Sequence, residues 1–426
     1  MQRIIFFTIL FLITFLLQIL VLNSFRKYFS DNNSIRKRIN IILMIIILYF
    51  NIPYLLLILL RLKISELPEL VNYIYVLPLY IYLSTIVFMG IIILITKLIK
   101  LPLILASFIL KRFKLIREKI IKLKKQKSIV KFENSRRTFI KYSGLFLAGY
   151  AFAGSGIGII SKDKYEILNK TIKLKNLPAG LKGLKIVLFS DIHTGPYMQE
   201  STMNKYADVV NTLNADIILI PGDITNSIAE EALSFSKSFK HLNSKFGVYA
   251  TLGNHDYFSS PDEIQQIIED NTSIKLLRNK SEILSINGTN LCILGSEDTR
   301  DSGAGNNAII NGFIEQTITD AKEKAKINNI SYDSLIKILL CHKPYVFDFI
   351  DEFNIDLMLS GHTHGGQIIF ASAGELNFSI ASAVSKYVAG YYNNGAMNLY
   401  ISRGIGTVGL PLRVNCPPEI TIIKLE

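Results

Sequence analysis

The apolar residues of this chain follow two patterns, which divide it near residue 160. In the first part they form long runs over residues 4–22, 39–60 and 70–96, without an Asp, Glu, Lys or Arg inside any run. Each run reaches about 20 residues, the length with which an α-helix crosses a hydrocarbon core of about 30 Å. The pattern therefore predicts three membrane-spanning helices.

A fourth apolar stretch, residues 142–160, is only moderately hydrophobic because it contains five glycines. It follows Arg136 and Arg137, and residues 135–141 resemble the twin-arginine motif of bacterial export signals. We predict that residues 142–160 form a fourth span. The apolar residues 98–110 are too few to cross comfortably, and we expect them to lie at the membrane interface.

Positive charge is concentrated in the connections between these spans. The net charge of +13 divides into +18 for residues 1–160 and −5 for the remainder. The connection 23–38 carries five Lys or Arg, and the segment 97–141 carries fifteen with only two Glu. Because basic loops stay on the cytoplasmic side, we expect residues 161–426 to lie on the extracytoplasmic side of a bacterial cytoplasmic membrane. Membrane lipids and the twin-arginine export machinery are the expected partners of the first part.

After residue 161 the apolar runs become short and end in polar residues. Five runs do so, in "LKIVLFSDIHTG", "ADIILIPGDITN", "GVYATLGNHDYF", "IKILLCHKPYVF" and "IDLMLSGHTHGGQ". Such runs predict buried strands, and in layered α/β folds ligands collect at the carboxyl ends of the strands. The clusters contain five of the six histidines and supply Asp191, His193, Asp223, Asn254, His255, Asp256, His342, His362 and His364.

These residue types predict a metal centre. Seven nitrogen and oxygen ligands without a thiol are too many for one tetrahedral ion and suit two transition metals that share a carboxylate. Asp191 and His193 are two positions apart, as are His362 and His364, so we expect each pair to point the same way from an extended backbone. Glycines stand beside the clusters and are expected to let the backbone turn sharply, at Gly222, Gly253 and Gly361.

The ordered blocks D-x-H, G-D, G-N-H-D, a lone H and G-H-x-H resemble the calcineurin-like metallophosphoesterase superfamily, over roughly residues 185–426. The form "GHTHGGQ" and the tail "LYISRGIGTVGLPLRVNCPPEITIIKLE" further resemble its membrane-associated subgroup. This resemblance implies an α/β fold with four layers, α/β/β/α, and two mixed β-sheets for residues 161–426. A multi-span helical membrane region, residues 1–160, would precede that domain.

The resemblance also implies a role for each residue. The ligands would divide between two ions, with Asp191, His193 and His364 on the first, Asn254, His342 and His362 on the second, and Asp223 bridging them. Mn, Fe, Zn or Co would suit these ligands and would activate a water for in-line attack on phosphorus. His255 would contact a phosphate oxygen and stabilise or protonate the leaving group, oriented by Asp256.

Three features lie outside these clusters. Arg403 and Arg413 belong to the tail and could contact substrate phosphate, but we expect structural salt bridges instead. The polar stretch "SEDTRDSGAGNN", residues 296–307, is expected to be a surface loop that could border the active-site mouth. His241 is expected to be a surface or packing histidine.

Together these features predict a membrane-anchored phosphoesterase that hydrolyses a phosphodiester or pyrophosphate bond of a lipid or envelope component. Related enzymes split the pyrophosphate of UDP-2,3-diacylglucosamine, an alternative that conflicts with the predicted side because that substrate is cytoplasmic. A nuclease or nucleotide phosphodiesterase is disfavoured because the acidic domain lacks an evident basic stripe, and we expect no nucleic-acid partner. A non-catalytic metal-binding sensor is disfavoured because no ligand is missing.

Overall fold

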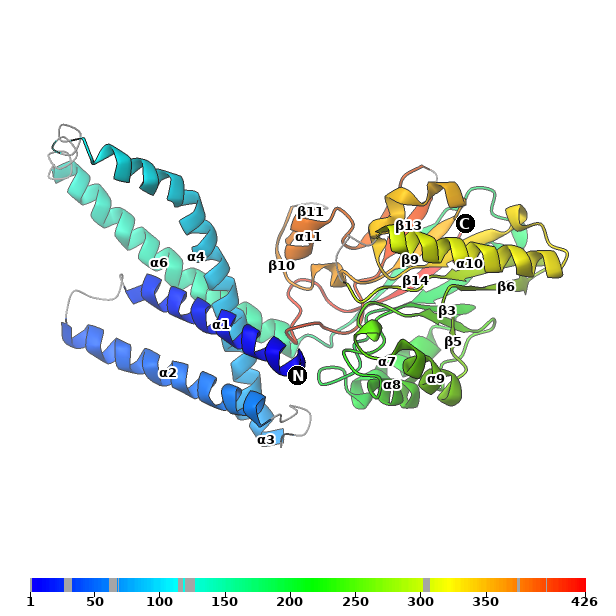
Figure 1. The fold of residues 1–426 in the computed structure, drawn as a ribbon, viewed down its shortest axis with the longest axis horizontal. Coiled ribbons are helices and arrows are strands. Elements are labelled where there is room, and N and C mark those ends of the chain that lie inside the picture. Colours follow the sequence, from blue (N-terminus) through cyan, green and yellow to red (C-terminus); the bar gives the residue numbers. More distant parts are fainter. Residues whose placement is uncertain are drawn as a thin grey trace. The chain divides into compact units, whose positions relative to one another are not determined.

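The computed structural model describes residues 2–26, 33–60, 67, 69–113, 118, 127–301, 307–373, 376–395 and 397–426. The chain divides into two compact units, residues 1–159 and 160–426. The first unit is helical, and the second combines helices with β-sheets (Figure 1).

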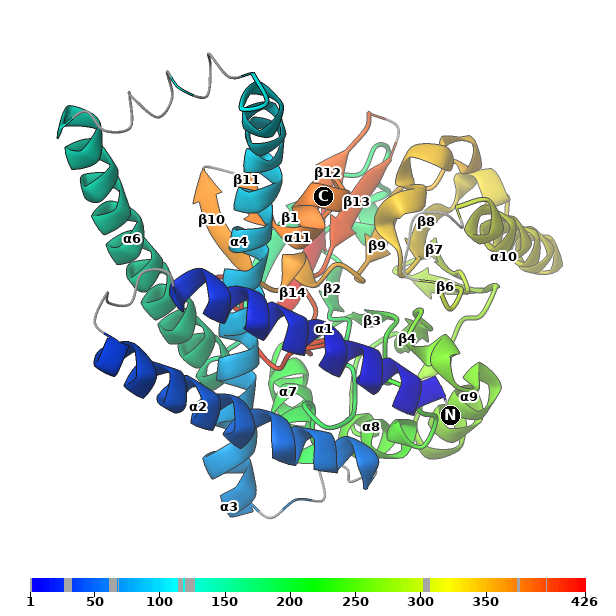
Figure 2. The same ribbon diagram turned by 60° about the vertical axis from the view of Figure 1, so that its left-hand side comes forward.

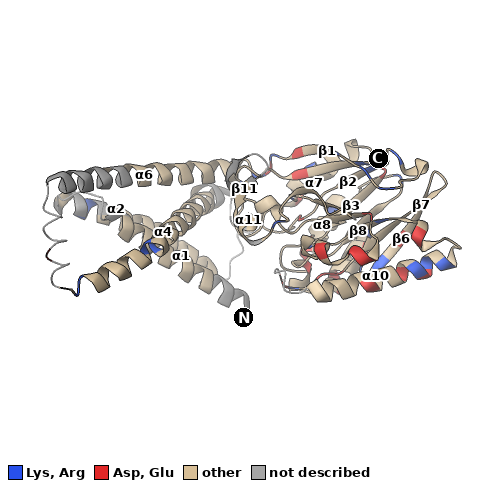
Figure 3. Cartoon of the chain, turned by 90° about the horizontal axis from the view of Figure 1, so that it is seen from above, with Lys and Arg blue, Asp and Glu red and all other residues tan. Residues whose placement is uncertain are grey.

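The first unit consists of long apolar helices: α1 (Gln2–Arg26), α2 (Asn33–Leu59), the short α3 (Glu69–Val71) with the π-helical η2 (Asn72–Val76), α4 (Leu77–Leu110) and α6 (Lys127–Ile160). Among the described residues, three stretches are long and apolar enough to cross a membrane: Asn40–Leu59, Ile74–Leu110 and Tyr142–Ile160. The apolar stretch of α1, Thr8–Ser24, is shorter. Figure 3 shows mostly uncharged residues on the coloured parts of these helices.

Helix α4 continues past residue 96, where the predicted third span ends. It includes the whole of the predicted interfacial segment 98–110, so that the apolar helical stretch reaches 37 residues. Lys97 and Lys100 do not end the helix, because lysine is a good helix former and both side chains are exposed. One helix therefore contains both predicted segments, and the division between a span that ends at residue 96 and an interfacial segment stays a prediction.

A polar network lies inside the first unit and joins three of its helices. Gln18 of α1 donates to Asn51 Oδ1 of α2 at 3.1 Å and accepts from Asn51 Nδ2 at 2.7 Å. Tyr82 of α4 donates to the same Gln18 oxygen at 3.0 Å. Both amide side chains are buried, so the network ties the helices together where apolar packing alone would leave their rotation undefined.

The second unit contains two six-stranded mixed sheets. The first sheet has the order β1 (Glu166–Ile172), β14 (Glu419–Leu425), β2 (Lys185–Leu188), β3 (Ile217–Pro221), β4 (Val248–Thr251) and β5 (Lys275–Leu276). The second has the order β12 (Gly390–Asn393), β13 (Asn398–Ile401), β9 (Leu357–Ser360), β8 (Ile336–Leu340), β7 (Thr289–Gly295) and β6 (Lys280–Ile286). In each sheet the strands that carry the predicted site residues are parallel neighbours.

Strand alternation produces the layers. Ile186 and Leu188 of β2 pack against the second sheet, whereas Val187 faces the helices α7 (Glu200–Thr212), α8 (Glu231–Phe239) and α9 (Pro261–Asn271). On the far side of the second sheet, Leu339 and Met358 pack against α10 (Asn307–Ile327). Figures 1 and 2 show α7, α8 and α9 on one side and α10 on the other. The predicted α/β/β/α order with two mixed sheets is confirmed.

Short elements complete the second unit. They are η3 (Ala179–Leu181), η4 (Asp256–Phe258), η6 (Tyr332–Ser334), η7 (Pro344–Phe349), η8 (Asp351–Phe353), η9 (His364–Gly366), the hairpin β10 (Ile369–Ala373) with β11 (Leu376–Ser379), and α11 (Ile380–Val384). Two of these matter for the site, because η4 begins directly after His255 and η9 begins at His364.

Candidate metal centre

The predicted site residues follow the carboxyl ends of five strands. Strands β2, β3 and β4 of the first sheet lead to Asp191 and His193, to Asp223, and to Asn254 and His255. Strands β8 and β9 of the second sheet lead to His342 and to His362 with His364. Because these strands are parallel within each sheet, their carboxyl ends lie at one edge, and the structure brings all seven predicted ligands together there.

The spacing of the D-x-H and H-x-H pairs predicts an extended backbone, but the backbone at this edge is not extended. Asp191 and His193 both have φ of +49°, and His362 and His364 have φ of +73° and +51°. These are left-handed conformations, which cost energy for residues with a Cβ and persist where surrounding contacts enforce them. The paired side chains converge because the chain turns after each strand, and the prediction of an extended backbone is wrong.

The three glycines beside the clusters allow close approach of the loops. Gly222 has φ of +88°, and a Cβ there would lie 2.8 Å from His342 Nδ1. Cβ atoms at Gly253 and Gly361 would collide with the carboxylates of Asp223 and Asp191. A sharp turn explains the first glycine, and tight packing against a ligand side chain explains the other two.

Three groups of side chains are close enough to share an ion. They are Asp191 with His193 and His364, His193 with Asp223 and His255, and Asp223 with His342 and His362, each with ligand atoms within 4.8 Å of one another. Asp223 Oδ2 lies 3.4 Å from His193 Nε2 and 3.2 Å from His342 Nε2. Asp223 therefore stands between the two outer groups, the position expected of a bridging carboxylate.

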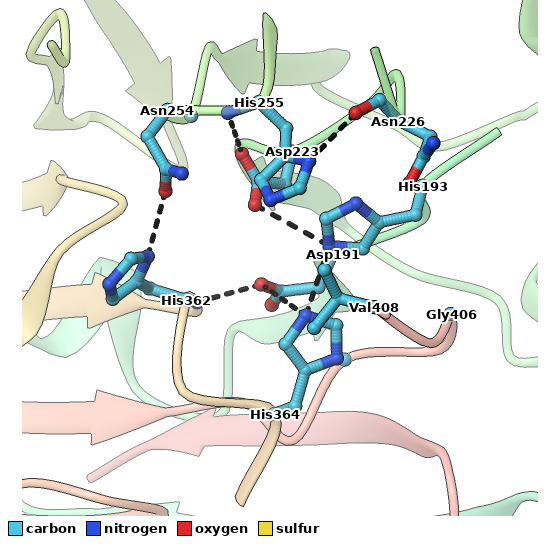
Figure 4. A network of polar contacts seen from close by, with 12 residues as sticks. Asp191, His193, Asp223, Asn226, Asn254, His255, His362, His364, Gly406 and Val408 are labelled. Carbon is cyan, nitrogen blue, oxygen red and sulfur yellow. Dashed lines mark hydrogen bonds and ion pairs between the residues drawn. The ribbon is translucent and has the colours of Figure 1, made fainter. Parts of the chain in front are cut away.

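Hydrogen bonds hold the ligands toward the shared space (Figure 4). The Nε2 atoms of His193 and His364 are 3.0 Å apart, and the backbone N–H of His362 donates to Asp191 Oδ1 at 2.8 Å. Asn254 Oδ1 lies 2.8 Å from His362 Nδ1, so the amide reaches the second group. All seven predicted ligands therefore belong to the cluster.

Burial and mutual charge set the protonation of these groups. Burial lowers the pKa of His193 to about 3, so its imidazole is neutral near pH 7. Burial alone would raise the pKa of Asp223, but the neighbouring His342 and His255 hold it well below its ordinary value. Burial alone would lower the pKa of His342, but Asp223 and Asp191 raise it to about 10. The positive charge of protonated His342 thus compensates the buried carboxylates of Asp223 and Asp191.

The residues fit a bound metal on three counts. Nε2 of His342 is buried and has no partner in good hydrogen-bond geometry among the described residues, with Asp223 Oδ2 at 3.2 Å as its ion-pair neighbour. A carboxylate and neutral imidazoles are the forms in which these side chains coordinate metals. The proton that Asp223 holds on His342 is one that a cation would displace, because metal binding releases protons from its ligands. The donor set, which has no thiolate, suits Mn, Fe, Zn or Co.

His255 stands beside the cluster, with its ring centroid 4.5 Å from that of His193. Its Nδ1 lies 2.7 Å from the carbonyl oxygen of Asn226, and its backbone N–H donates to Asp223 Oδ1 at 2.8 Å. Asn226 was not predicted from the sequence. Its contact with His255 is made by its backbone carbonyl oxygen, which every residue type has, so its side chain gave no signal.

Asp256 does not orient His255 as the resemblance implied. Its buried carboxylate accepts from the backbone N–H groups of Ile224, Thr225 and Gly253, at 3.2, 2.7 and 2.9 Å. It also accepts from the Thr225 hydroxyl at 2.9 Å. Asp256 therefore fixes the loop after β3 to the loop after β4, and it positions His255 only through the backbone.

The two tail arginines have different roles. Arg403 forms the expected salt bridges, at 2.6 Å to Glu419 and 2.8 Å to Glu166. Arg413 is buried and donates to the carbonyl oxygens of Gly406 and Cys416 rather than to a carboxylate. One of its nitrogens lies 3.4 Å from Nδ1 of His364, so Arg413 packs against a predicted metal ligand.

Comparison with known proteins agrees with this geometry. The sequence profile of the family described as calcineurin-like phosphoesterase matches residues 184–366. The uncharacterized metallophosphoesterase YkuE of Bacillus subtilis is 30% identical, over 68% of this chain and 98% of that protein. The uncharacterized metallophosphoesterase Cj0846 of Campylobacter jejuni is 30% identical, over 61% of this chain and 63% of that protein.

A vertebrate relative also contains membrane spans according to its name. The transmembrane protein with metallophosphoesterase domain of Danio rerio is 29% identical, over 61% of this chain and 57% of that protein. Similarity of this extent to YkuE, together with the matched profile and the clustered ligands, defines the family. The chain belongs to the calcineurin-like metallophosphoesterases, which are metal-dependent phosphoesterases, and to their membrane-associated members.

Proposed function

We propose that this protein is a membrane-anchored dimetal phosphoesterase that hydrolyses a phosphodiester or pyrophosphate bond in a lipid or envelope component. The position of Asp223 between two groups of metal-binding side chains carries the proposal. The apolar helices before the domain support an anchor, and an anchor favours a substrate that lies in or near the membrane.

Seven side chains would hold the two ions. Asp191, His193 and His364 would hold the first, Asn254, His342 and His362 the second, and Asp223 both. When bound, such a pair of cations neutralises phosphate charge and makes water nucleophilic near neutral pH. The strands that lead to the site end in an apolar core that excludes water, since Leu340 of β8 and Leu359 of β9 are fully buried.

His255 would act on the leaving group. Its Nδ1–H donates to the carbonyl oxygen of Asn226, which leaves Nε2 as the nitrogen that can donate a proton. Positioned general acids of this kind contribute roughly 10²–10⁴-fold to rate. The hydrogen bond from the His255 backbone to Asp223 keeps the imidazole next to the metal cluster while the leaving oxygen departs.

The test uses the full chain, purified in detergent, stripped of metal and then supplied with Mn, Fe, Zn or Co. We expect hydrolysis of bis(4-nitrophenyl) phosphate to return with metal, together with about two metal ions per chain by elemental analysis. Asp223→Asn should lower both metal content and rate, the rate by roughly 100-fold or more, because even residues behind metal ligands change activity 10–100-fold.

The chain provides a matched control in His241, the one histidine of the six that lies outside the five clusters. His241 is exposed and lies outside the cluster, so His241→Asn should keep both the metal content and the rate. His255→Asn should keep the metal and lose rate, most strongly for leaving groups of high pKa. Full activity in the metal-free protein, or in Asp223→Asn, would refute a dimetal mechanism.

A further inference from the structure

The segment Ser296–Arg300, which begins after β7, is fastened to the candidate metal centre. Lys343, the residue after His342, places its Nζ 2.5 Å from Asp298 Oδ1, and both side chains are almost completely buried. The same Nζ donates to the carbonyl oxygen of Thr299 at 3.2 Å. The start of the predicted mouth loop is therefore held against the end of β8.

A second set of contacts fastens the segment to η4, which follows His255. The Tyr257 hydroxyl donates to Glu297 Oε1 at 2.8 Å, and Arg278 lies 2.6 Å from the same carboxylate. Glu297 and Asp298 are thus each paired with a cation. The segment is therefore fixed at two points next to Arg300.

Arg300 then lies beside His255, across one aromatic ring. Its guanidinium carbon is 5.8 Å from the centroid of the Phe258 ring, and that ring is 4.5 Å from the ring of His255. Phe258 is 37% exposed and Arg300 is exposed. A partly exposed ring with a cation over it therefore lies against His255, the residue that would protonate the leaving group.

We infer that Phe258 and Arg300 form a subsite for a leaving group that carries its own phosphate. This assignment rests on the proposed function, in which His255 protonates the leaving oxygen. The ring of Phe258 would support the body of the leaving group, and the guanidinium would pair with its phosphate, a geometry that arginine favours. The substrate would then be a pyrophosphate diester, either lipid-linked or soluble.

The reaction balances without another reactant. Water adds to one phosphorus, the bond from that phosphorus to the bridging oxygen breaks, and the bridging oxygen leaves with the second phosphate and the proton from His255. The proton released by the attacking water restores the acid. One pyrophosphate diester and one water give two phosphate monoesters.

Two substrates that share one phosphoryl group test the subsite. Ethyl 4-nitrophenyl phosphate and P1,P2-diethyl pyrophosphate both place an ethyl phosphoryl group at the metals, but only the second has a phosphate on its leaving group. We expect Arg300→Gln to lower the ratio of kcat/KM for the pyrophosphate to that for the diester by roughly tenfold or more, because a charge-assisted pair is lost. Phe258→Leu should lower kcat/KM for both compounds, because the ring would support the body of either leaving group.

A matched control comes from a second cation over an aromatic ring. Lys322 lies 5.5 Å from the Tyr332 ring, near the start of β8 and hence at the opposite end of that strand from His342. Lys322→Gln should leave the ratio unchanged. A pyrophosphate in which one ethyl group is replaced by dodecyl, tested in detergent micelles, distinguishes a lipid-linked from a soluble natural substrate. Its kcat/KM should exceed that of the diethyl compound if the natural substrate is lipid-linked and fall below it if the natural substrate is soluble.

The outcomes separate this inference from the function beneath it. A wild-type enzyme that hydrolyses the diester, but shows no Arg300-dependent preference for the pyrophosphate, overturns the subsite and leaves the metallophosphoesterase intact. A reconstituted wild-type enzyme that hydrolyses neither compound overturns both. A selective loss in Arg300→Gln, absent from Lys322→Gln, supports the subsite.

Discussion

Asp223 shows at the residue scale how one side chain organises the site. Its Oδ2 faces histidines from both sheets, and its Oδ1 accepts from the backbone of His255. Both carboxylate oxygens are therefore used, and no rotation of the side chain could satisfy one partner without losing another. The left-handed backbone at Asp223, φ +52°, is kept by these contacts.

Asp256 provides a residue-scale prediction because its contacts are structural. Asp256→Asn replaces one acceptor oxygen with an amide that faces backbone N–H donors, so several donors lose their partner. We expect the free energy of unfolding to fall by roughly 2–4 kcal/mol in urea titrations, since each unsatisfied buried group costs about 1–3 kcal/mol. Asp262→Asn, at a carboxylate that is 87% exposed, is the control and should change stability by less than about 0.5 kcal/mol. Loss of rate at unchanged stability in Asp256→Asn would instead favour direct orientation of His255.

The ligand set could be predicted from the sequence because metal chemistry restricts residue types and the strands order them. Asp191 and His364 are far apart in the sequence, yet both follow short apolar runs, and that common signal places them at one edge. The role of Asp256 could not be predicted, because its partners are backbone N–H groups that are identical in every residue. The left-handed φ at His193 has the same cause: it results from tertiary contacts rather than local propensity.

At the scale of elements, a carboxylate of α10 adds a polar contact with β6 to the apolar packing of the helix on the second sheet. Asp320 accepts from the backbone N–H and the hydroxyl of Ser281 in β6, at 2.8 and 2.7 Å. It also lies 3.0 Å from Lys324, one turn further along the helix. Burial alone would raise the pKa of Asp320, but these hydrogen bonds lower it.

This attachment predicts a pH dependence. Because the pKa of Asp320 is lower in the folded chain, its carboxylate stabilises the fold above the unfolded-state pKa of about 4, and that contribution is lost as the pH falls through the folded pKa. Asp320→Asn should lower the free energy of unfolding by roughly 1–2 kcal/mol at pH 7. The difference from wild type should shrink below about pH 4. Glu323→Gln, at an exposed position on the same helix, should show no such difference, and a gap that persists at low pH would contradict this account.

The polar network of the first unit gives a second element-scale prediction. Gln18→Leu removes the hydrogen bonds that join α1 to α2 and α4, and it leaves a buried amide on Asn51. We expect a loss of roughly 0.6–2 kcal/mol, seen as a lower Tm of the full chain in detergent. Ile19→Leu, at the adjacent exposed position, should keep the Tm. An unchanged Tm in Gln18→Leu would show that packing alone holds these helices.

At the scale of the whole molecule, bound metal should stabilise the chain. A ligand held by the folded state alone adds stability, about 2.7 kcal/mol at 100 times its Kd, and these ligands are clustered only when both sheets are formed. Removing metal with a chelator should therefore lower the Tm, and adding metal back should restore it. Asp223→Asn should respond much less to the chelator. An equal response in that variant would place the stabilising metal elsewhere.

The side of the membrane on which the domain lies is also a property of the whole chain. Reporter fusions, active only outside the cytoplasm, can be placed after Lys164 and after Lys97. The basic segments predict activity at Lys164 and none at Lys97. Silence at Lys164 would place the domain in the cytoplasm and make the arginine pair at 136–137 a coincidence.

Strand β14 has a consequence for how the protein is made. It lies between β1 and β2, parallel to one and antiparallel to the other, although the rest of the domain separates it from both in sequence. During synthesis, β1 and β2 emerge long before the strand that must separate them. Strand β1 therefore cannot join the first sheet until the ribosome has made β14, because β14 is the strand between β1 and β2. The pairing of β2 with β3 and of β3 with β4, which positions Asp191 and Asp223, has no such requirement.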